Sequence, residues 1–348
     1  MRSCQLLVPI CIRHDCQYVN PEIFVIIISD LFQVKCKVLQ PKIELPLPSV
    51  SKLIGPTSRS KLDPIVYNSM DYRDPSTTSS RDFKIYKFSS PRSEPPQFGT
   101  GITALDISPS GMLSLDSSVS CITKESFKVV VNSWCDTVKH GAGCTFFEFC
   151  QTDSHFQHGS VVTSLEPMYP KDHKITSFPR FTREFTEDVE VVTWFDHIKA
   201  HCFKTGFLDI DTCTNSTKWG YFELVYGACR QPQQLYNLGT TWIAYPKSKP
   251  GIDSGRINKV KFGLVGAANE AQGTVTMEAT FKKKFKKPPQ VWLALCGINI
   301  TLAGDNLRLR TQVVKDSITT IGFNYEVISW GKNVLETVSL YWLAVELD

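Results

Sequence analysis

Long apolar runs are missing from the 348-residue sequence. The best candidate, residues 23–28, has about a third of the ~20 residues that a membrane helix needs, and an acidic residue bounds it on each side. The start of the chain has Arg2 and a short apolar stretch but no small-residue cleavage site, which makes a poor signal peptide. We therefore expect no membrane insertion, and either a cytoplasmic location or an unconventional route of export.

A strong excess of one charge is also missing. Lys and Arg number 38 against 34 Asp and Glu, a net charge of +4, and nonspecific nucleic-acid binding goes with a more basic balance. We therefore expect no nucleic-acid partner. The lysines of FKKKFKKPP (281–289) suit either a patch for an anionic polymer or a solubilising edge strand. The edge strand is favoured because no aromatic pattern for stacking bases accompanies these lysines.

Catalytic and metal-binding signatures are absent as well. There is no G-x-S-x-G, no phosphate-binding loop and no G-x-G-x-x-G, so we expect no enzyme and no cofactor. The 12 cysteines show no C-x-x-C spacing, and we interpret most of them as buried thiols. His197, His201 and Cys202 form H-x-x-x-H-C, which would share a helix face, but the segment follows a strand and is expected in a loop. No metal site is predicted.

Short apolar and alternating runs separated by turn residues dominate the chain after about residue 60. Clear examples are VEVVTWF (189–195), FKVVVNSW (127–134), VWLALC (291–296) and VSLYWLAV (338–345). Helical periodicity over ten residues is hard to find. This pattern predicts an all-β protein built from sandwiches or barrels.

The β pattern recurs with a period of about 98 residues. Pro95 lies seven positions after Phe88, Pro288 lies seven positions after Phe281, and Trp134 lies 196 positions before Trp330. A third, more divergent copy lies between them and ends in TTWIAYP. We therefore divide the chain into an N-terminal extension or linker (1–60), which is rich in Pro and Ser, and three repeats (61–150, 151–250 and 251–348).

The order of motifs within a repeat resembles the H-type lectin family. In the third repeat the motifs are PPQVWLAL, DNLRLR, IGFNYEVISW and VSLYWLAVEL, and in the first they are PPQFGTGITALDI and SFKVVVNSWCDT. The resemblance implies three tandem six-stranded antiparallel β-sandwiches that bind galactose or N-acetylgalactosamine without acting on it. Family members usually form trimers with sites near the seams between protomers, so three copies in one chain predict either an intrachain pseudo-trimer or a homo-oligomer.

The resemblance also implies the site residues. Arg308 stands at the family's sugar-binding arginine, where Ser114 and Asp209 take its place in the other repeats. The remaining candidates lie in the turn before the last strand or at the family's tyrosine position: Trp330, Trp134, Asp136, His140, Tyr236 and Arg230. A planar guanidinium can donate to two neighbouring hydroxyls, and an aromatic ring can cover the C–H face of a sugar.

Simpler interpretations remain open for these residues. Arg308 and Arg310 alternate with Leu307 and Leu309, so both arginines face away from the core, and either can be a surface residue paired with an acid. Trp330 and Trp134 can close the sandwich as core residues. No repeat carries the full set, so the sites are either composite across repeats or partly lost. The predicted function is a multivalent lectin, and the alternative is a structural or protein-interaction module with decayed sugar sites.

Overall fold

The computed structural model describes residues 65–72, 76, 78–108, 112–149, 155–164, 173–202, 206–228, 235–261, 273–302 and 304–347. All of them belong to one compact unit, residues 56–348, and the N-terminal extension predicted for residues 1–60 lies outside the described residues. Within the described part of the chain there is no helix long and apolar enough to cross a membrane.

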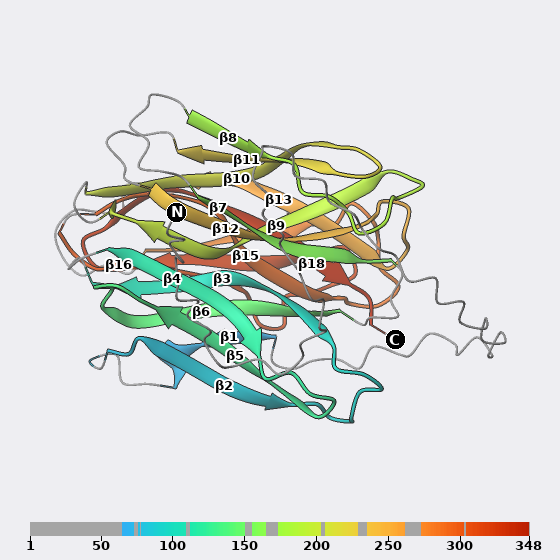
Figure 1. Ribbon diagram of the computed structural model, residues 1–348, viewed down its shortest axis with the longest axis horizontal. Helices are drawn as coiled ribbons and strands as arrows, with labels where there is room; N and C mark the ends of the chain where they lie inside the picture. Colours follow the sequence, from blue (N-terminus) through green and yellow to red (C-terminus); the bar gives the residue numbers. More distant parts are fainter. Residues whose placement is uncertain are drawn as a thin grey trace, which may run out of the picture. The chain divides into compact units, whose positions relative to one another are not determined.

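Eighteen strands form three successive sets of six (Figure 1). The first set consists of β1 (Val66–Asn68), β2 (Arg81–Lys87), β3 (Gln97–Ile107), β4 (Leu113–Ser120), β5 (Ser126–Ser133) and β6 (Lys139–Phe149), with a 3-10 turn, η1 (Ser69–Asp71). The second set consists of β7 (Gln157–Ser164), β8 (His173–Ser177), β9 (Val189–Ala200), β10 (Phe207–Thr217), β11 (Phe222–Ala228) and β12 (Leu235–Pro246). The third set consists of β13 (Ile252–Lys261), β14 (Gly273–Thr280), β15 (Gln290–Thr301), β16 (Leu307–Val313), β17 (Gly322–Ser329) and β18 (Val334–Val345).

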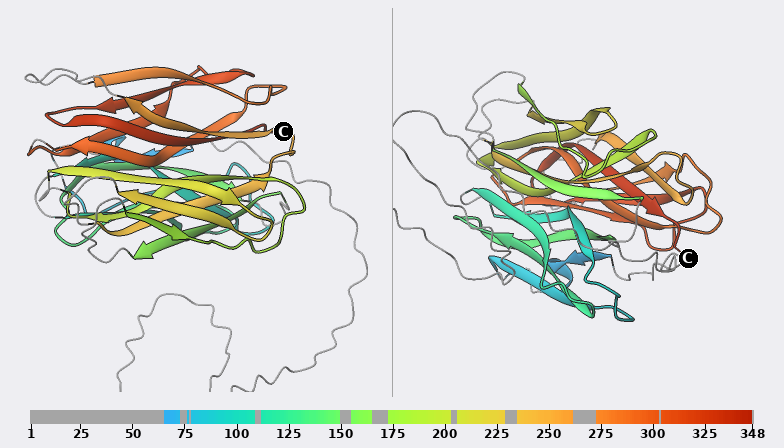
Figure 2. Two further views of the ribbon diagram at one scale, coloured as in Figure 1. Left: turned by 90° about the horizontal axis from the view of Figure 1, so that it is seen from above. Right: turned by 45° about the vertical axis from the view of Figure 1, so that its right-hand side comes forward.

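Each of the three six-stranded sheets joins two of these sets. The strand orders are β1-β6-β3-β16-β17-β14, β2-β5-β4-β9-β12-β7 and β13-β18-β15-β10-β11-β8, and all recorded pairings are antiparallel. In every case the third strand of one set pairs with the fourth strand of another. The first set therefore pairs with the second, the second with the third and the third with the first, which closes a ring. Two further views show the same sheets from above and with the right-hand side turned forward (Figure 2).

Each set still forms a sandwich, because its two groups of three strands pack face to face. In the first set the rings of Phe98 on β3 and Phe127 on β5 lie 4.4 Å apart, and those of Tyr86 on β2 and Phe146 on β6 lie 5.1 Å apart. In the second set Phe222 on β11 packs on Trp242 of β12 at 5.4 Å. Such aromatic pairs bury large apolar areas, which stabilise a domain made of short strands.

A second apolar cluster lies where the three sets meet. Trp194 of β9 donates its indole N–H to the Tyr341 carbonyl of β18 at 2.9 Å, and Trp292 of β15 donates to the Phe146 carbonyl of β6 at 3.0 Å. Both indoles are buried. Each of these hydrogen bonds therefore ties one set to the next.

The predicted fold class is confirmed: the described chain is all-β, with three six-stranded antiparallel sheets and strands at each of the four quoted segments. The division at residues 150 and 250 stays a prediction. The lysine run was assigned wrongly, since Lys282–Lys287 lies in the turns between β14 and β15 and not in an edge strand. Of the six described cysteines, three are buried: Cys144, Cys202 and Cys296.

Candidate functional site

Three equivalent seams arise where two sets share a sheet. At the first seam β16 pairs with β3, and Arg308 stands opposite Asp106. At the second seam β4 pairs with β9, and Ser114 stands opposite Lys199. At the third seam β10 pairs with β15, and Asp209 stands opposite Asn299. The register pairs next to these three are Leu307–Ile107, Leu113–Ala200 and Leu208–Ile300. Arg308, Ser114 and Asp209 therefore occupy one structural position in three copies.

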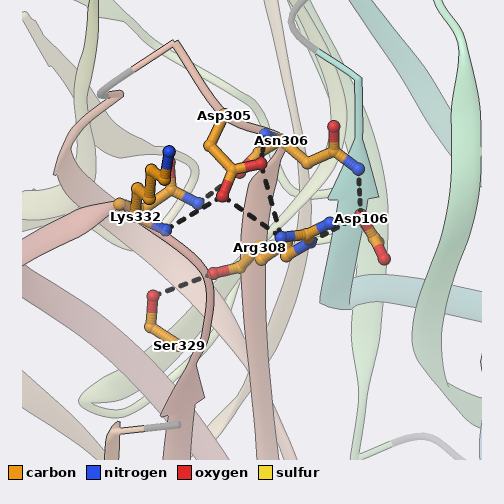
Figure 3. Close-up of polar contacts among 7 residues, drawn as sticks. Asp106, Asp305, Asn306, Arg308, Ser329 and Lys332 are labelled. Atoms are coloured by element: carbon orange, nitrogen blue, oxygen red, sulfur yellow. Dashed lines mark hydrogen bonds and ion pairs between the residues drawn. The ribbon is translucent and has the colours of Figure 1, made fainter. Parts of the chain in front are cut away.

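Arg308 lies at the first seam between two carboxylates. Its Nε is 3.4 Å from an oxygen of Asp106, and its Nη1 donates to Asp305 at 3.2 Å (Figure 3). Asn306 donates its side-chain N–H to the same Asp106 oxygen at 3.0 Å. Because Leu307 and Leu309 are fully buried on the other face of β16, the guanidinium points out of the core and its side chain stays 25% exposed. The predicted outward orientation is confirmed.

The turn after β17 closes over this arginine. Ser329 donates its hydroxyl to the Arg308 carbonyl at 3.0 Å, and the Lys332 amide donates to Asp305 at 2.9 Å (Figure 3). Burial alone would raise the pKa of the Asp305 carboxyl, but the backbone amides of Lys332 and Asn306 and the Arg308 guanidinium hold it below its usual range. Trp330 lies in this turn and is half-buried. Among the described residues no hydrogen bond is recorded for Nη2 of Arg308, which leaves a donor for a ligand.

The family's tyrosine position is a β-bulge in all three sets. His140 is skipped between the pairs Asp106–Gly141 and Ile107–Lys139, and Tyr236 is skipped between the pairs of Lys199 and Ala200. Glu336 is skipped in the same way opposite Asn299 and Ile300. The extra residue of a bulge lies outside the regular strand register, so its side chain departs from the alternation of the strand. His140, Tyr236 and Glu336 are thereby placed at the first, second and third seams.

The second seam brings together residues of the first and second sets. Trp134, which follows β5, packs its ring 4.9 Å from that of His197 on β9. The turn that carries Trp134 is fixed to β4: Asp136 accepts from the Met112 amide at 2.9 Å, and Thr137 accepts from the Ser114 amide at 2.9 Å. Burial, with the nearby Lys199 charge, lowers the pKa of His197. Both effects favour the neutral form of the imidazole beside Trp134.

Tyr236 completes the same seam from the other side. The Lys199 Nζ lies 5.8 Å from the centre of the Tyr236 ring, and the His201 ring lies 5.5 Å from it. Lys199 stands opposite Ser114, so the cation at this seam comes from β9 and not from β4. The sequence analysis predicted a loop for His197, but this residue lies within β9. Among the described residues there is no group of three or more metal-ligating side chains.

The third seam carries no basic residue at the equivalent pair. Asp209 is buried opposite Asn299, and the Asn299 amide and the Thr301 hydroxyl donate to Glu336 at 3.3 and 3.1 Å. Arg230, predicted for the turn beside this seam, lies outside the described residues. The recorded donors of Asn299 and Thr301 are thus directed to Glu336, whereas the buried Oδ1 of Asn299 has no hydrogen-bond partner among the described residues.

The predicted residues thus lie on strands and turns that border two seams. Arg308, Trp330 and His140 lie on elements that border the first seam, and Trp134, Asp136 and Tyr236 lie on elements that border the second. Sequence reasoning missed the partners of these residues, chiefly Asp106, Asp305, Asn306, His197 and Lys199. Asp106 lies within the quoted ITALDI segment, but only the strand register shows that it faces Arg308.

Comparison with known proteins gives one match. The model of the H-type lectin domain matches residues 84–147 and 276–345, which lie in the first and third sets. No curated protein and no solved structure matches the chain. The matched regions run from β2 to β6 and from β14 to β18, and together they supply both sides of the first seam. These two regions of the chain are therefore similar to the H-type lectin domain, the family that the sequence motifs resemble.

Proposed function

We propose that this protein is a non-catalytic lectin that binds galactose- or N-acetylgalactosamine-type glycans at its first and second seams. The observation that carries the proposal is the position of Arg308. It lies across from Asp106, between two strand sets, with one guanidinium nitrogen uncommitted and its side chain partly exposed. The galactose-type preference is taken from the family.

The first seam has the groups that a hexose needs. A carboxylate accepts hydrogen bonds from sugar hydroxyls, and a guanidinium donates to neighbouring oxygens. Asp106 and Arg308 are already held by Asn306 and Asp305, so little conformational freedom is lost when a ligand binds. His140 and Trp330 would complete the rim with rings.

The second seam offers a different set to a sugar. Trp134 and Tyr236 supply rings, while Lys199 supplies a single ammonium in place of the guanidinium fork. A shallow site with one point charge binds weakly by itself. Two sites on one rigid body would raise the avidity for clustered glycans through effective concentration.

At the third seam the alternative function is favoured. Asn299 and Thr301 already donate to Glu336, and the position of the arginine is taken by the buried Asp209. We propose that this seam is a structural contact in which sugar binding has been lost.

Arg308→Ala tests the first seam. Removing a charge-assisted donor costs about 1.5–3 kcal/mol, so we expect affinity for N-acetylgalactosamine to fall about ten- to a hundredfold, measured by calorimetry with a glycan array as a screen. Arg310→Ala is the matched control, because Arg310 lies two residues along the same strand and pairs with Asp71 at 3.2 Å. Its affinity should stay within about twofold.

The opposite results would reject the assignment. If Arg308→Ala and Trp134→Ala each leave binding unchanged, neither seam holds the sugar. If the unchanged protein is retained by no galactose-type glycan, the alternative of a structural or interaction module stands.

A further inference from the structure

A groove of about 860 Å³ lies on the second set, away from the seam pairings. Its walls are the start of β9, the end of β10 and the hairpin between β10 and β11. The third seam uses only residues 207–211 of β10, whereas the groove uses residues 214–217. The groove is therefore separate from the three seams.

Trp219 stands in the hairpin at the edge of this groove. Its carbonyl accepts from the Phe185 amide at 3.0 Å. The equivalent hairpins make the same bond with other residues: Lys124 accepts from Arg92 at 2.7 Å, and Thr320 accepts from Phe285 at 3.0 Å. The fold therefore needs only the backbone at this position. The Trp219 side chain is 71% exposed, so it serves no packing role that would explain an indole.

Acidic residues line the same groove as this ring, and two of them are particular to the second set. In the second set, Asp188 and Glu190 lie three and five residues after Phe185, whose amide donates to the hairpin. The same count gives Pro95 and Gln97 in the first set and Pro288 and Gln290 in the third. Trp219, Asp188 and Glu190 thus all line one groove. The two acidic residues stand where the other sets have neutral residues, and Trp219 stands where they have Lys124 and Thr320.

The rest of the lining favours a neutral ligand over a charged one. Three carboxylates (Glu187, Asp188 and Glu190) stand against two ammonium groups (Lys218 and Lys247), and Lys282 comes within 3.6 Å of Glu190. Hydroxyls and an amide from Thr214, Asn215, Ser216 and Thr217 supply further donors and acceptors. The charges in the groove nearly balance, and its lining includes carboxylates, an exposed indole and a second ring, Tyr221. These groups suit a sugar better than a polycation or polyanion.

We propose that this groove is a further glycan-binding site, specific to the middle strand set, which takes a neutral oligosaccharide with one sugar stacked on Trp219. It extends the proposed lectin function to a new surface and rests on that function only for the class of ligand. Carboxylates of Asp188 and Glu187 would accept from sugar hydroxyls, and Lys247 would donate.

The test uses the full chain, made without N-glycosylation because Asn215 lies in an N-S-T sequon in the groove. The protein is labelled with 5-fluorotryptophan, and the Trp219 resonance is assigned from its loss in Trp219→Thr, which restores the residue of the third hairpin. The probes are maltotetraose, cellotetraose, N-acetylchitotetraose and a β-galactotetraose, with an oligolysine as the charged competitor. Measurements are repeated in an Arg308→Ala background.

We expect one or more tetrasaccharides to shift the Trp219 resonance equally in both backgrounds. Calorimetry with the same tetrasaccharide should show that Trp219→Thr, which lacks this resonance, binds it at least tenfold more weakly. Lys124→Thr, the matched change in the first hairpin, should have no effect. The proposal is overturned if no tetrasaccharide shifts the resonance at about 10 mM, or if oligolysine alone shifts it, which would indicate a cationic partner. Failure of the proposed seams appears separately, as unchanged N-acetylgalactosamine binding in Arg308→Ala.

Discussion

At the scale of single residues, the most unusual group in the sheets is a buried carboxyl that lies apart from the seam pairings. Asp196 on β9 accepts from Ser160 at 2.6 Å and from Thr241 at 2.8 Å, and no cation lies among its recorded partners. Burial raises its pKa to about 6, from an ordinary value of 3.8, even though these hydroxyls act in the opposite direction. The folded chain therefore binds a proton at Asp196 more tightly than the unfolded chain does.

This predicts a pH dependence for Asp196→Asn. Since the pKa in the folded state is raised, the stability that Asp196 contributes is fully present below about pH 4 and is lost as pH rises through about 6. The asparagine variant lacks that loss. Its free energy of unfolding should therefore rise relative to the unchanged protein between pH 4 and pH 7, by at most about 3 kcal/mol.

Urea denaturation at several pH values measures that difference. His158, whose pKa burial lowers to about 4, acts in the opposite direction over the same range, but it does so in both proteins and cancels. A difference between the two proteins that stays constant from pH 4 to pH 7 would contradict the prediction.

At the scale of elements, the strands that meet where the three sets join pack side chains of very different size against one another. Gly101 of β3, Trp194 of β9 and Ala294 of β15 meet in one layer. A Cβ added at Gly101 would stand 2.5 Å from the Ala294 Cβ and 2.7 Å from the Trp194 Cβ. The indole on one strand is therefore accommodated by the missing side chain on another.

Gly101→Ala should destabilise the protein. The clashing atoms are Cβ atoms, which are bonded directly to the backbone and cannot move by a rotamer change. We therefore expect a loss of about 1–3 kcal/mol in the free energy of unfolding. Gly227→Ala is the control, because the nearest atom to its added Cβ is 3.9 Å away, and it should be neutral or slightly stabilising. Equal effects of the two changes would show that the layer tolerates repacking.

Sequence patterns predicted the strands well but not how the strands pair. Alternation such as that of Leu307 to Arg310 is a local signal, and it identified β16 and its exposed face. Pairing of β16 with β3 joins Arg308 to a residue about 200 positions earlier, and no local pattern carries that information. For the same reason Arg308 was identified as a candidate while its partner Asp106 was missed.

At the scale of the whole molecule, the shared sheets bind the three sets into one cooperative unit. No set has a sheet of its own, since each contributes three strands to one sheet and three to another. A set that unfolded alone would leave two neighbouring sheets with bare edges. Partial unfolding is therefore costly.

We predict a single unfolding transition for residues 56–348. Far-UV circular dichroism and tryptophan fluorescence should give the same urea midpoint, because Trp194 and Trp292 lie between sets and report on the same event as the strands. Gly101→Ala should shift both signals together. Two resolved transitions, or different midpoints for the two signals, would mean that the sets unfold independently.

The closed ring also determines how binding can diversify. Three identical chains around an axis must repeat every change three times, so all their seams stay alike. Here one polypeptide holds an Arg–Asp, a Ser–Lys and an Asp–Asn pair at the same position. Each seam can therefore change its chemistry separately, so that a single chain can carry three unlike surfaces at fixed spacing.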